Sequence, residues 1–193
     1  MREKLLAFIC LTACFVQRVS AQMYVNVIPA EKVPVPYIGA LLEAREFKDA
    51  LGLHYYVATD VRTDKTDSLF VRRYTKTAAG FVLDWQIRDF SPYGITYETW
   101  LKIKDIDGDG VYETAFVYRV EGDVVAHGLM REKLILHYKN KKYAIRNTAH
   151  YGVDDDKATM DKSFDTLPKS VKAFVINMWN KEVGSSDIVQ EIH

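Results

Sequence analysis

The chain has 193 residues, of which 48% are hydrophobic and 27% are charged, with ten Gly and five Pro. This composition excludes a disordered, collagenous or low-complexity chain and predicts a buried core. The 26 basic residues equal the 26 acidic ones, so the charge offers no basic footprint for nucleic acid. One domain is the default at this length, and composition alone does not identify a function.

The first 21 residues predict a signal peptide. A charged start, Met1–Lys4, precedes an apolar stretch, Leu5–Val16, that is shorter than the about 20 residues needed to span a bilayer. Small residues end the segment at Ala21, and cleavage there leaves Gln22 as the first residue. A lipobox that ends at Cys14 makes a lipid anchor the alternative, and an uncleaved anchor is a third. Cleavage and lipidation both imply export to the periplasm or the cell surface.

Both cysteines, Cys10 and Cys14, lie in this leader, so the form that begins at Gln22 has no disulfide and no thiol nucleophile. The leader holds three of the basic residues and one of the acidic residues, so the rest of the chain has a formal charge of −2. Disulfide staples are typical of domains below about 80 residues. The exported chain is larger and is expected to rely on its core.

Residues 22–38 predict an extended segment, since three prolines lie between positions 29 and 36 and Tyr24–Ile28 is a short strand candidate. Residues 39–51 predict a short helix that ends before Gly52, where a terminating glycine belongs. The apolar residues of this segment lie roughly on one helical face: Leu41, Leu42, Phe47 and Leu51.

From Leu53 to Gly152 the apolar pattern changes to period two, which predicts half-buried strands. Leu134, Leu136 and Tyr138, for example, occupy every second position. Turn residues separate the strands at 77–80, 91–94, 105–110 and 139–141, and such short connections favour an antiparallel meander. The expected strands are 53–60, 68–75, 81–89, 95–104, 113–120, 132–138 and 142–149.

A C-terminal amphipathic helix is expected after the sequence Asp165–Pro168, which combines a capping residue with an early proline. We therefore predict an α+β fold, in which one antiparallel meander sheet carries a short N-terminal helix and has the C-terminal helix packed on one face. The single domain spans residues 39–182, and residues 183–193 form a tail. The apolar positions of the C-terminal helix follow helical spacing: Val171, Phe174, Val175, Met178 and Trp179.

One loop carries recognisable chemistry. Counted from Asp105, carboxylates stand at positions 1, 3, 5 and 9 and a glycine stands at position 6. Alternate side chains can then turn toward one centre and form the oxygen cage that a hard cation requires. Asp105, Asp107 and Asp109 are predicted to ligate directly, Val111 through its carbonyl, and Glu113 directly or through water. Calcium fits better than magnesium, which keeps more of its waters and demands a stricter octahedron.

This loop differs from an EF-hand, because position 12 is Phe116 instead of Glu and the flanks are predicted strands. It resembles the Asp-rich calcium loops of integrin-type repeats, in which an acidic residue at position 9 completes the site. The alternative is a metal-free hairpin turn rich in Asp and Gly.

A wider resemblance covers most of residues 40–182. The matching segments are Glu43–Gly52, Leu83–Phe90, the Asp loop with Phe116–Tyr118, Lys141–Arg146 and the helix that ends at Lys181. In this order they resemble a family of secreted Bacteroidota proteins that are labelled uncharacterised or surface polysaccharide biosynthesis proteins. The resemblance implies an envelope location and provides no catalytic residues.

No catalytic residue is predicted. The five histidines lack metal-ligand spacing, and no nucleophile elbow, P-loop or dinucleotide motif is present. His137 is interpreted as a structural residue, and Asp84 is expected to face solvent. Twelve tyrosines and three tryptophans fit either a core or a sugar-stacking face. The preferred hypothesis is a non-enzymatic exported envelope protein, stabilised by calcium, that binds an unknown protein or glycan and has no transmembrane span in the mature chain. The alternative is an accessory enzyme of surface polysaccharide biosynthesis.

Overall fold

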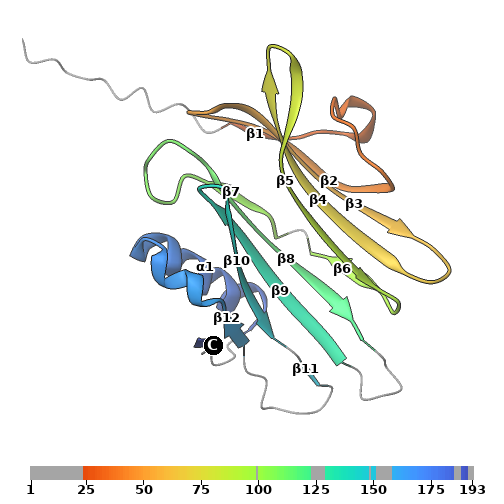
Figure 1. The fold of residues 1–193 in the computed structure, drawn as a ribbon, viewed down its shortest axis with the longest axis vertical. Helices are drawn as coiled ribbons and strands as arrows, with labels where there is room; N and C mark the ends of the chain where they lie inside the picture. The colour runs from red at the N-terminus through yellow and green to blue at the C-terminus, as the bar shows by residue number, and fades with distance from the viewer. Residues whose placement is uncertain are drawn as a thin grey trace, which may run out of the picture.

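The computed structural model describes residues 24–98, 100–122, 129–147, 149–150, 158–184 and 188–190. The predicted signal peptide, its cleavage site and the alternative lipidation site at Cys14 lie outside these residues. Within them the fold is α+β and mostly β, with two largely antiparallel sheets and one C-terminal α-helix (Figure 1). Among these residues, no helix has the length and apolar character needed to cross a bilayer.

The first sheet is an antiparallel meander in which each strand pairs with the next along the chain. Its long central strands pair over most of their length. Between the first two strands lies a short 3-10 helix, η1 (Ala30–Lys32). The strands are β1 (Val25–Val27), β2 (Ala40–Asp49), β3 (Gly52–Arg62), β4 (Asp67–Thr77) and β5 (Gly80–Ser91).

The second sheet has the order β13-β12-β10-β9-β8-β6, with β7 also paired to β8 and β11 to β9. All its pairs are antiparallel except β12 with β13. A 3-10 helix, η2 (Lys162–Thr166), leads from it to α1 (Lys169–Glu182). The strands are β6 (Ile95–Tyr97), β7 (Lys102–Lys104), β8 (Glu113–Glu121), β9 (Leu129–Tyr138), β10 (Lys141–Asn147), β11 (Ala149–His150), β12 (Ala158–Met160) and β13 (Ile188–Gln190).

The period-two prediction agrees closely with these strands. Every strand expected between residues 53 and 149 is present, although 95–104 is divided into β6 and β7. The β9–β10 turn at Lys139 and Asn140 has positive φ angles of 45° and 61°, the conformation of a type I′ hairpin turn. The predicted single sheet is instead two sheets, because short connections determine local pairing without determining which pairs share a sheet.

The predicted helix over residues 39–51 is wrong. Residues 40–49 form β2, which pairs with β1 on one side and β3 on the other. Two of the apolar positions behind the prediction are poorly buried, since Leu42 is 37% and Leu51 is 64% exposed. Backbone pairing on both sides of β2 therefore prevails over a modest helical pattern. Gly52, interpreted as a helix terminator, has φ 133° and begins β3 after the turn.

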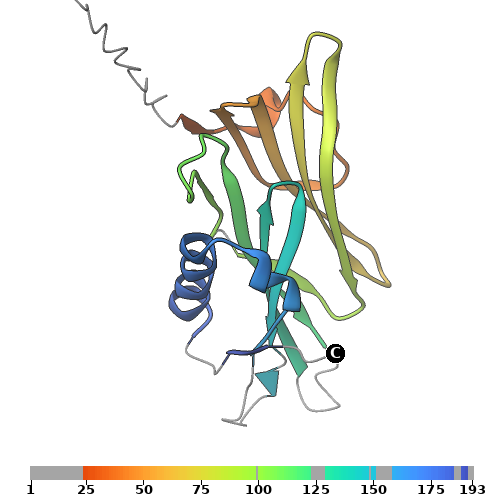
Figure 2. The ribbon, with the colours of Figure 1, turned by 60° about the vertical axis from the view of Figure 1, so that its left-hand side comes forward.

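The two sheets pack face to face, and α1 covers the opposite face of the second sheet (Figure 2). The predicted helix is thus confirmed, with Val171, Val175, Met178 and Trp179 buried. On the outer face of the first sheet, residues from the N-terminal segment, Val33 and Val35 among them, pack over β2–β4. Figure 2 shows the resulting order of layers, from the first sheet through the second to the helix.

Because it lies between a sheet and a helix, β9 is buried on both faces. Leu134 and Leu136 face the helix, while Ile135 packs in the core between the sheets. His137 lies on the same strand and is only 8% exposed. The expectation of a half-buried strand is therefore wrong for β9. The polar side chain of His137 therefore lies in the interior.

Candidate metal centre and adjoining cavity

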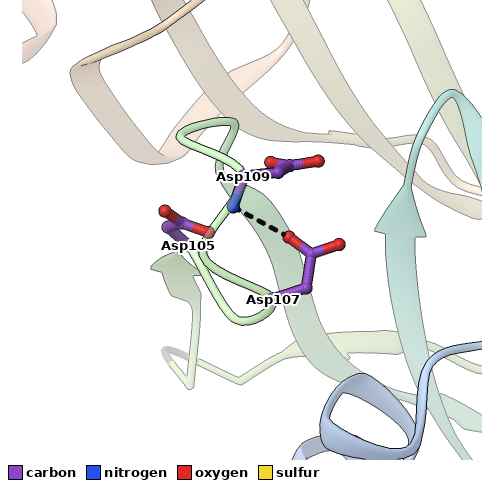
Figure 3. A group of neighbouring side chains, drawn as sticks. All are labelled: Asp105, Asp107 and Asp109. Carbon is purple, nitrogen blue, oxygen red and sulfur yellow. Dashed lines mark hydrogen bonds between the residues drawn. The ribbon is translucent and has the colours of Figure 1, made fainter. Parts of the chain in front are cut away.

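The Asp-rich loop connects β7 to β8 at one end of the second sheet. Asp105, Asp107 and Asp109 gather around one bend of this loop (Figure 3). One carboxylate oxygen from each lies within 4.8 Å of the other two. The three side chains at positions 1, 3 and 5 thus converge as the spacing predicts.

Backbone N–H groups hold these carboxylates in place. Asp105 accepts hydrogen bonds from the N–H of Gly108 at 2.7 Å and of Gly110 at 3.0 Å. Asp107 accepts one from the N–H of Asp109 at 3.3 Å, drawn in Figure 3. Both glycines have φ angles of 80–85°, which other residues rarely adopt. The sequence Asp-Gly-Asp-Gly therefore curls the loop around its own side chains.

Neighbouring side chains from the β9–β10 hairpin partly neutralise the carboxylates. The hydroxyl of Tyr138 donates to Asp107 at 2.8 Å, and the ammonium of Lys139 lies 3.5 Å from Asp107 and 3.1 Å from Asp109. Burial alone would raise the pKa of Asp107, but hydrogen bonds from Tyr138 and the Asp109 N–H, together with Lys139, lower it below its usual value. Asp107 is accordingly held in the charged form that a cation needs.

The other two predicted ligands lie differently. Glu113 is 3% exposed and accepts a hydrogen bond from the N–H of Ile106 at 2.8 Å, outside the group of three converging carboxylates. Burial, together with the charges of Asp107 and Asp109, raises the pKa of Glu113 to about 7. The N–H of Val111 donates to Asp109 at 2.9 Å. Ligation by Glu113 or by the Val111 carbonyl stays a prediction.

The Asp loop is also fastened to the first sheet. Asp49, at the end of β2, accepts a hydrogen bond from the N–H of Tyr112 at 3.1 Å, and the N–H of Ala50 donates to the carbonyl of Gly110 at 2.8 Å. A side chain on Gly110 would contact Ala50 at 3.4 Å. The loop that carries the carboxylates therefore joins the two sheets at this end of the molecule.

A buried charge cluster lies beside this junction, on the inner face of the first sheet. The guanidinium of Arg73, 8% exposed, lies 3.2 Å from Asp84 and 3.8 Å from Asp49. His54 contacts Asp49 at 2.8 Å. Burial lowers the pKa of Arg73, and the charges of Asp84 and Asp49 oppose that shift. We refer to Asp49, His54, Arg73 and Asp84 as the buried charge cluster.

This cluster was missed from the sequence, and Asp84 was expected to face solvent. As a residue Asp84 is exposed, as expected, but a β-bulge in β5 changes its pairing, because Leu83 pairs with Tyr74 while Trp85 pairs with Arg73, which leaves Asp84 as the extra residue. Its side chain is 21% exposed and faces Arg73. The sequence did contain a signal for this cluster. The period-two pattern of their strands places both His54 and Arg73 on the inward face.

A cavity of about 250 Å³ lies between the buried charge cluster and the Asp loop. On its wall, the rings of Trp85 and His137 lie 3.7 Å apart between centroids. Burial, with the nearby charges of Arg73 and Lys142, lowers the pKa of His137 to about 3, so the ring is neutral at pH 7. The lining residues are Leu51, Arg73, Trp85, Asp109, Val111, Tyr112, Glu113, His137, Lys139 and Asn140.

No family model matches the chain, and no curated protein or solved structure is detectably similar to it. The Asp loop and the cavity beside it are the features of the described residues that carry chemistry.

Proposed function

We propose that the protein is an exported, calcium-binding module of the cell envelope that acts by binding a protein or a glycan. The observation that carries the cation assignment is the convergence of Asp105, Asp107 and Asp109, whose oxygens lie within 4.8 Å of one another. Three carboxylates from one short loop form an oxygen-only donor set, which suits a hard divalent cation. The carbonyl of Val111 and the carboxylate of Glu113 are the proposed further ligands.

Calcium is favoured over magnesium because one short loop supplies all the proposed donors and calcium has the less demanding coordination geometry. Calcium accepts six to eight oxygens in a flexible arrangement, whereas magnesium requires a near-ideal octahedron and keeps several waters. In the absence of a cation, the ammonium of Lys139 partly balances Asp107 and Asp109. Bound calcium would balance these two carboxylates in place of the exposed Lys139, whose ion pairs contribute little.

The proposed role of calcium is structural. The loop belongs to the second sheet and is hydrogen-bonded through Gly110 and Tyr112 to the β2–β3 turn of the first sheet. A cation that rigidifies the loop would therefore also stabilise the contact between the sheets. Because the cavity shares Asp109, Val111 and Glu113 with the loop, calcium would also order one wall of the cavity.

Export is proposed from the predicted signal peptide, with lipidation at Cys14 as the alternative to cleavage after Ala21. The resemblance to secreted Bacteroidota proteins supports the same location. An accessory enzyme of surface polysaccharide biosynthesis is the second candidate. The observation in its favour is Glu113, whose pKa of about 7 beside a cavity is suited to general acid–base chemistry.

The test is thermal unfolding with calcium and with a chelator. With the dissociation constants of about 10⁻⁴–10⁻³ M that are typical of extracellular calcium modules, calcium at about 10 mM should add about 1–3 kcal/mol to the free energy of unfolding. For a chain of this size, that corresponds to roughly 3–10 °C in melting temperature. Asp107→Ala should abolish the shift, whereas Asp64→Ala, in the exposed β3–β4 turn, should retain it.

Identical melting curves with calcium and with chelator would contradict the cation assignment. A shift of equal size in the Asp107→Ala variant would show that calcium binds elsewhere. Turnover of a nucleotide-activated sugar, abolished by Glu113→Gln, would favour the enzyme over the binding module.

A further inference from the structure

The outer face of the first sheet carries two guanidinium groups without an acidic partner. Arg72 on β4 lies opposite Val57, which packs under the N-terminal segment, and Arg88 lies on β5. Their Cζ atoms lie 4.7 and 5.4 Å from the centre of the same ring, that of Phe70. Among the described residues, no ion pair joins either guanidinium to a carboxylate. Two like charges against one ring repel each other, and an anion bound near both would remove that repulsion.

Arg72 gives the stronger indication of an anionic ligand. Its side chain is largely buried, since the residue is 8% exposed, and its Nε donates to the side-chain oxygen of Gln86 at 2.7 Å. Its two Nη atoms have no hydrogen-bond partner within the described chain, and neither of them is fully enclosed. Arginine is rarely buried to this extent unless it is paired. Free donors on a largely buried guanidinium are therefore suited to a carboxylate from another molecule.

The carboxylates of β5 do not fill this role, because both are used on the opposite face of the sheet. Asp84 lies 3.2 Å from Arg73. Asp89 accepts a hydrogen bond from the hydroxyl of Tyr118 at 3.0 Å and is paired with Lys133. Past the bulge, the side chains of β5 that share the outer face with Arg72 include no acid. They are Leu83, Gln86, Arg88 and Phe90.

β5 also has an open edge. In the described part of the chain it pairs only with β4, so it forms the margin of the first sheet (Figure 2). An unpaired edge offers backbone N–H and C=O groups to another strand. Exposed apolar side chains on such an edge are typical of an interaction surface. Four of them lie on β5 and are 37–63% exposed: Phe81, Val82, Leu83 and Phe90.

A second copy of this chain does not fit the edge. Antiparallel pairing of two β5 strands would place outer-face side chains opposite outer-face side chains, because side chains alternate between the two faces. Arg88 would then meet Gln86, Phe90 or the second Arg88. None of these is an anion, so the guanidiniums would stay without acidic partners. A strand that neutralises them must bring its own acidic residues.

We infer that the open edge of β5 binds an extended acidic segment of a partner protein. The segment adds as one more strand and places carboxylates beside Arg88 and Arg72. The inference rests on the proposed binding function and selects a protein as the partner. Strand addition takes up the backbone groups of the edge, and acidic side chains on the outer face supply the missing anions.

The experiment is titration calorimetry of the purified protein with the peptide Thr-Val-Glu-Val-Glu-Val-Thr, which carries its acids on one face and valines on the other. It should bind with a dissociation constant of about 1 mM or lower, and added salt should weaken the binding. The same peptide with Lys in place of Glu should not bind.

Two N-methylated forms of the acidic peptide test strand addition separately from charge. Each form is methylated at alternate backbone nitrogens, in opposite phase. Only alternate N–H groups of an added strand face its neighbour, so one form should lose binding and the other should retain it. Equal binding of both forms would contradict addition to the edge.

Arg88→Gln removes an exposed cation and should weaken binding about threefold. Arg72→Gln should weaken it about tenfold, because a largely buried guanidinium forms stronger hydrogen bonds to a carboxylate. The exposed Arg88 keeps the test independent of how Arg72→Gln folds. The matched control is Arg131→Gln, an exposed arginine on β9 of the second sheet, which should bind as the unmodified protein does.

The inference is overturned by equal binding of the lysine peptide, by equal weakening in Arg131→Gln, or by no binding of the acidic peptide. Trigalacturonate that binds through Arg88 while the acidic peptide does not would also overturn it and would assign this face to an acidic glycan. The calcium shift in melting temperature is measured on the same samples. A calcium shift without peptide binding removes this inference alone, and peptide binding without a calcium shift removes the cation site alone.

Discussion

The Asp loop and the buried charge cluster are both rich in carboxylates and are joined through Asp49, but their charges are compensated differently. In the cluster, Asp49 and Asp84 face the buried guanidinium of Arg73, and Asp49 also contacts His54. In the loop, the compensating cation is Lys139, whose side chain is 56% exposed. The carboxylates of the cluster are therefore paired with a buried cation, whereas those of the loop have an exposed one.

This difference indicates which of the two sets of carboxylates is available to a ligand. Removing one partner from a buried ion pair leaves an uncompensated charge and is strongly destabilising, so the buried charge cluster is a structural element. Exposed ion pairs contribute little and exchange easily, so Lys139 can be displaced by a divalent cation. Carboxylate count alone does not distinguish the two regions.

The largest effect is expected on breaking the buried charge cluster. Arg73→Met would leave Asp49 and Asp84 without their cation and should lower the free energy of unfolding by about 3–5 kcal/mol. Urea unfolding at pH 7 measures this loss. Arg62→Met, which removes the exposed partner of Asp60, is the control and should have far less effect. Equal losses would contradict the distinction between buried and exposed compensation.

A second effect concerns the pH dependence contributed by His137. Its pKa is about 3 in the folded protein and near 6.5 when unfolded, so below pH 6.5 the unfolded chain binds a proton that the folded protein does not. Stability from this residue is complete above pH 6.5 and is lost as the pH falls toward 3. Relative to His137→Gln, the unmodified protein should lose about 2 kcal/mol between pH 7 and pH 5.

Urea unfolding of both proteins at the two pH values measures this difference. The carboxylates titrate equally in both proteins. Subtracting the change in unfolding free energy of His137→Gln from that of the unmodified protein therefore leaves the contribution of His137. An identical pH dependence in the two proteins would mean that the histidine is solvated in the folded state.

A smaller effect is expected from the surface partner of the Asp loop. Lys139→Asn retains a residue that tolerates the positive φ of the turn but removes the ammonium near Asp107 and Asp109. Calcium should then bind about two- to fivefold more tightly, because it no longer has to displace the ammonium of Lys139. Titration calorimetry measures the affinity. The exposed Lys141, changed to Gln, is the matched control and should leave it unaltered.

An effect of similar size should follow from Tyr138→Phe, which removes the hydroxyl that donates to Asp107 at 2.8 Å. Loss of one such hydrogen bond should cost about 0.5–1.5 kcal/mol in the chelated protein, measured by urea unfolding. If calcium coordinates Asp107, Tyr138→Phe should lower the free energy of unfolding less in calcium than in chelator, because the cation restrains the same carboxylate. A greater cost in calcium would indicate that the hydroxyl supports the bound state.

Much of the fold was predictable because its patterns are local. The alternation of Leu134, Leu136 and Tyr138 located β9, and the spacing from Val171 to Trp179 located α1. The convergence of Asp105, Asp107 and Asp109 was also predictable, since alternate residues and two glycines within one loop determine it. The helix expected over 39–51 was wrong, because the pairing of β2 with β1 and β3 is not local.

The sequence by itself determined the strands from β3 to β10, the C-terminal helix and the convergence of the three aspartates in the Asp loop, because each depends on residues close together in the chain. Only the tertiary structure decided that the strands form two sheets, that Arg73 meets Asp49 and Asp84, and that Trp85 and His137 share one cavity wall. These contacts join residues that are far apart in the chain, and a single bulge at Asp84 changes which side chain faces inward. The period-two pattern places Arg73 on the inner face of its strand, but it records neither these partners nor the bulge.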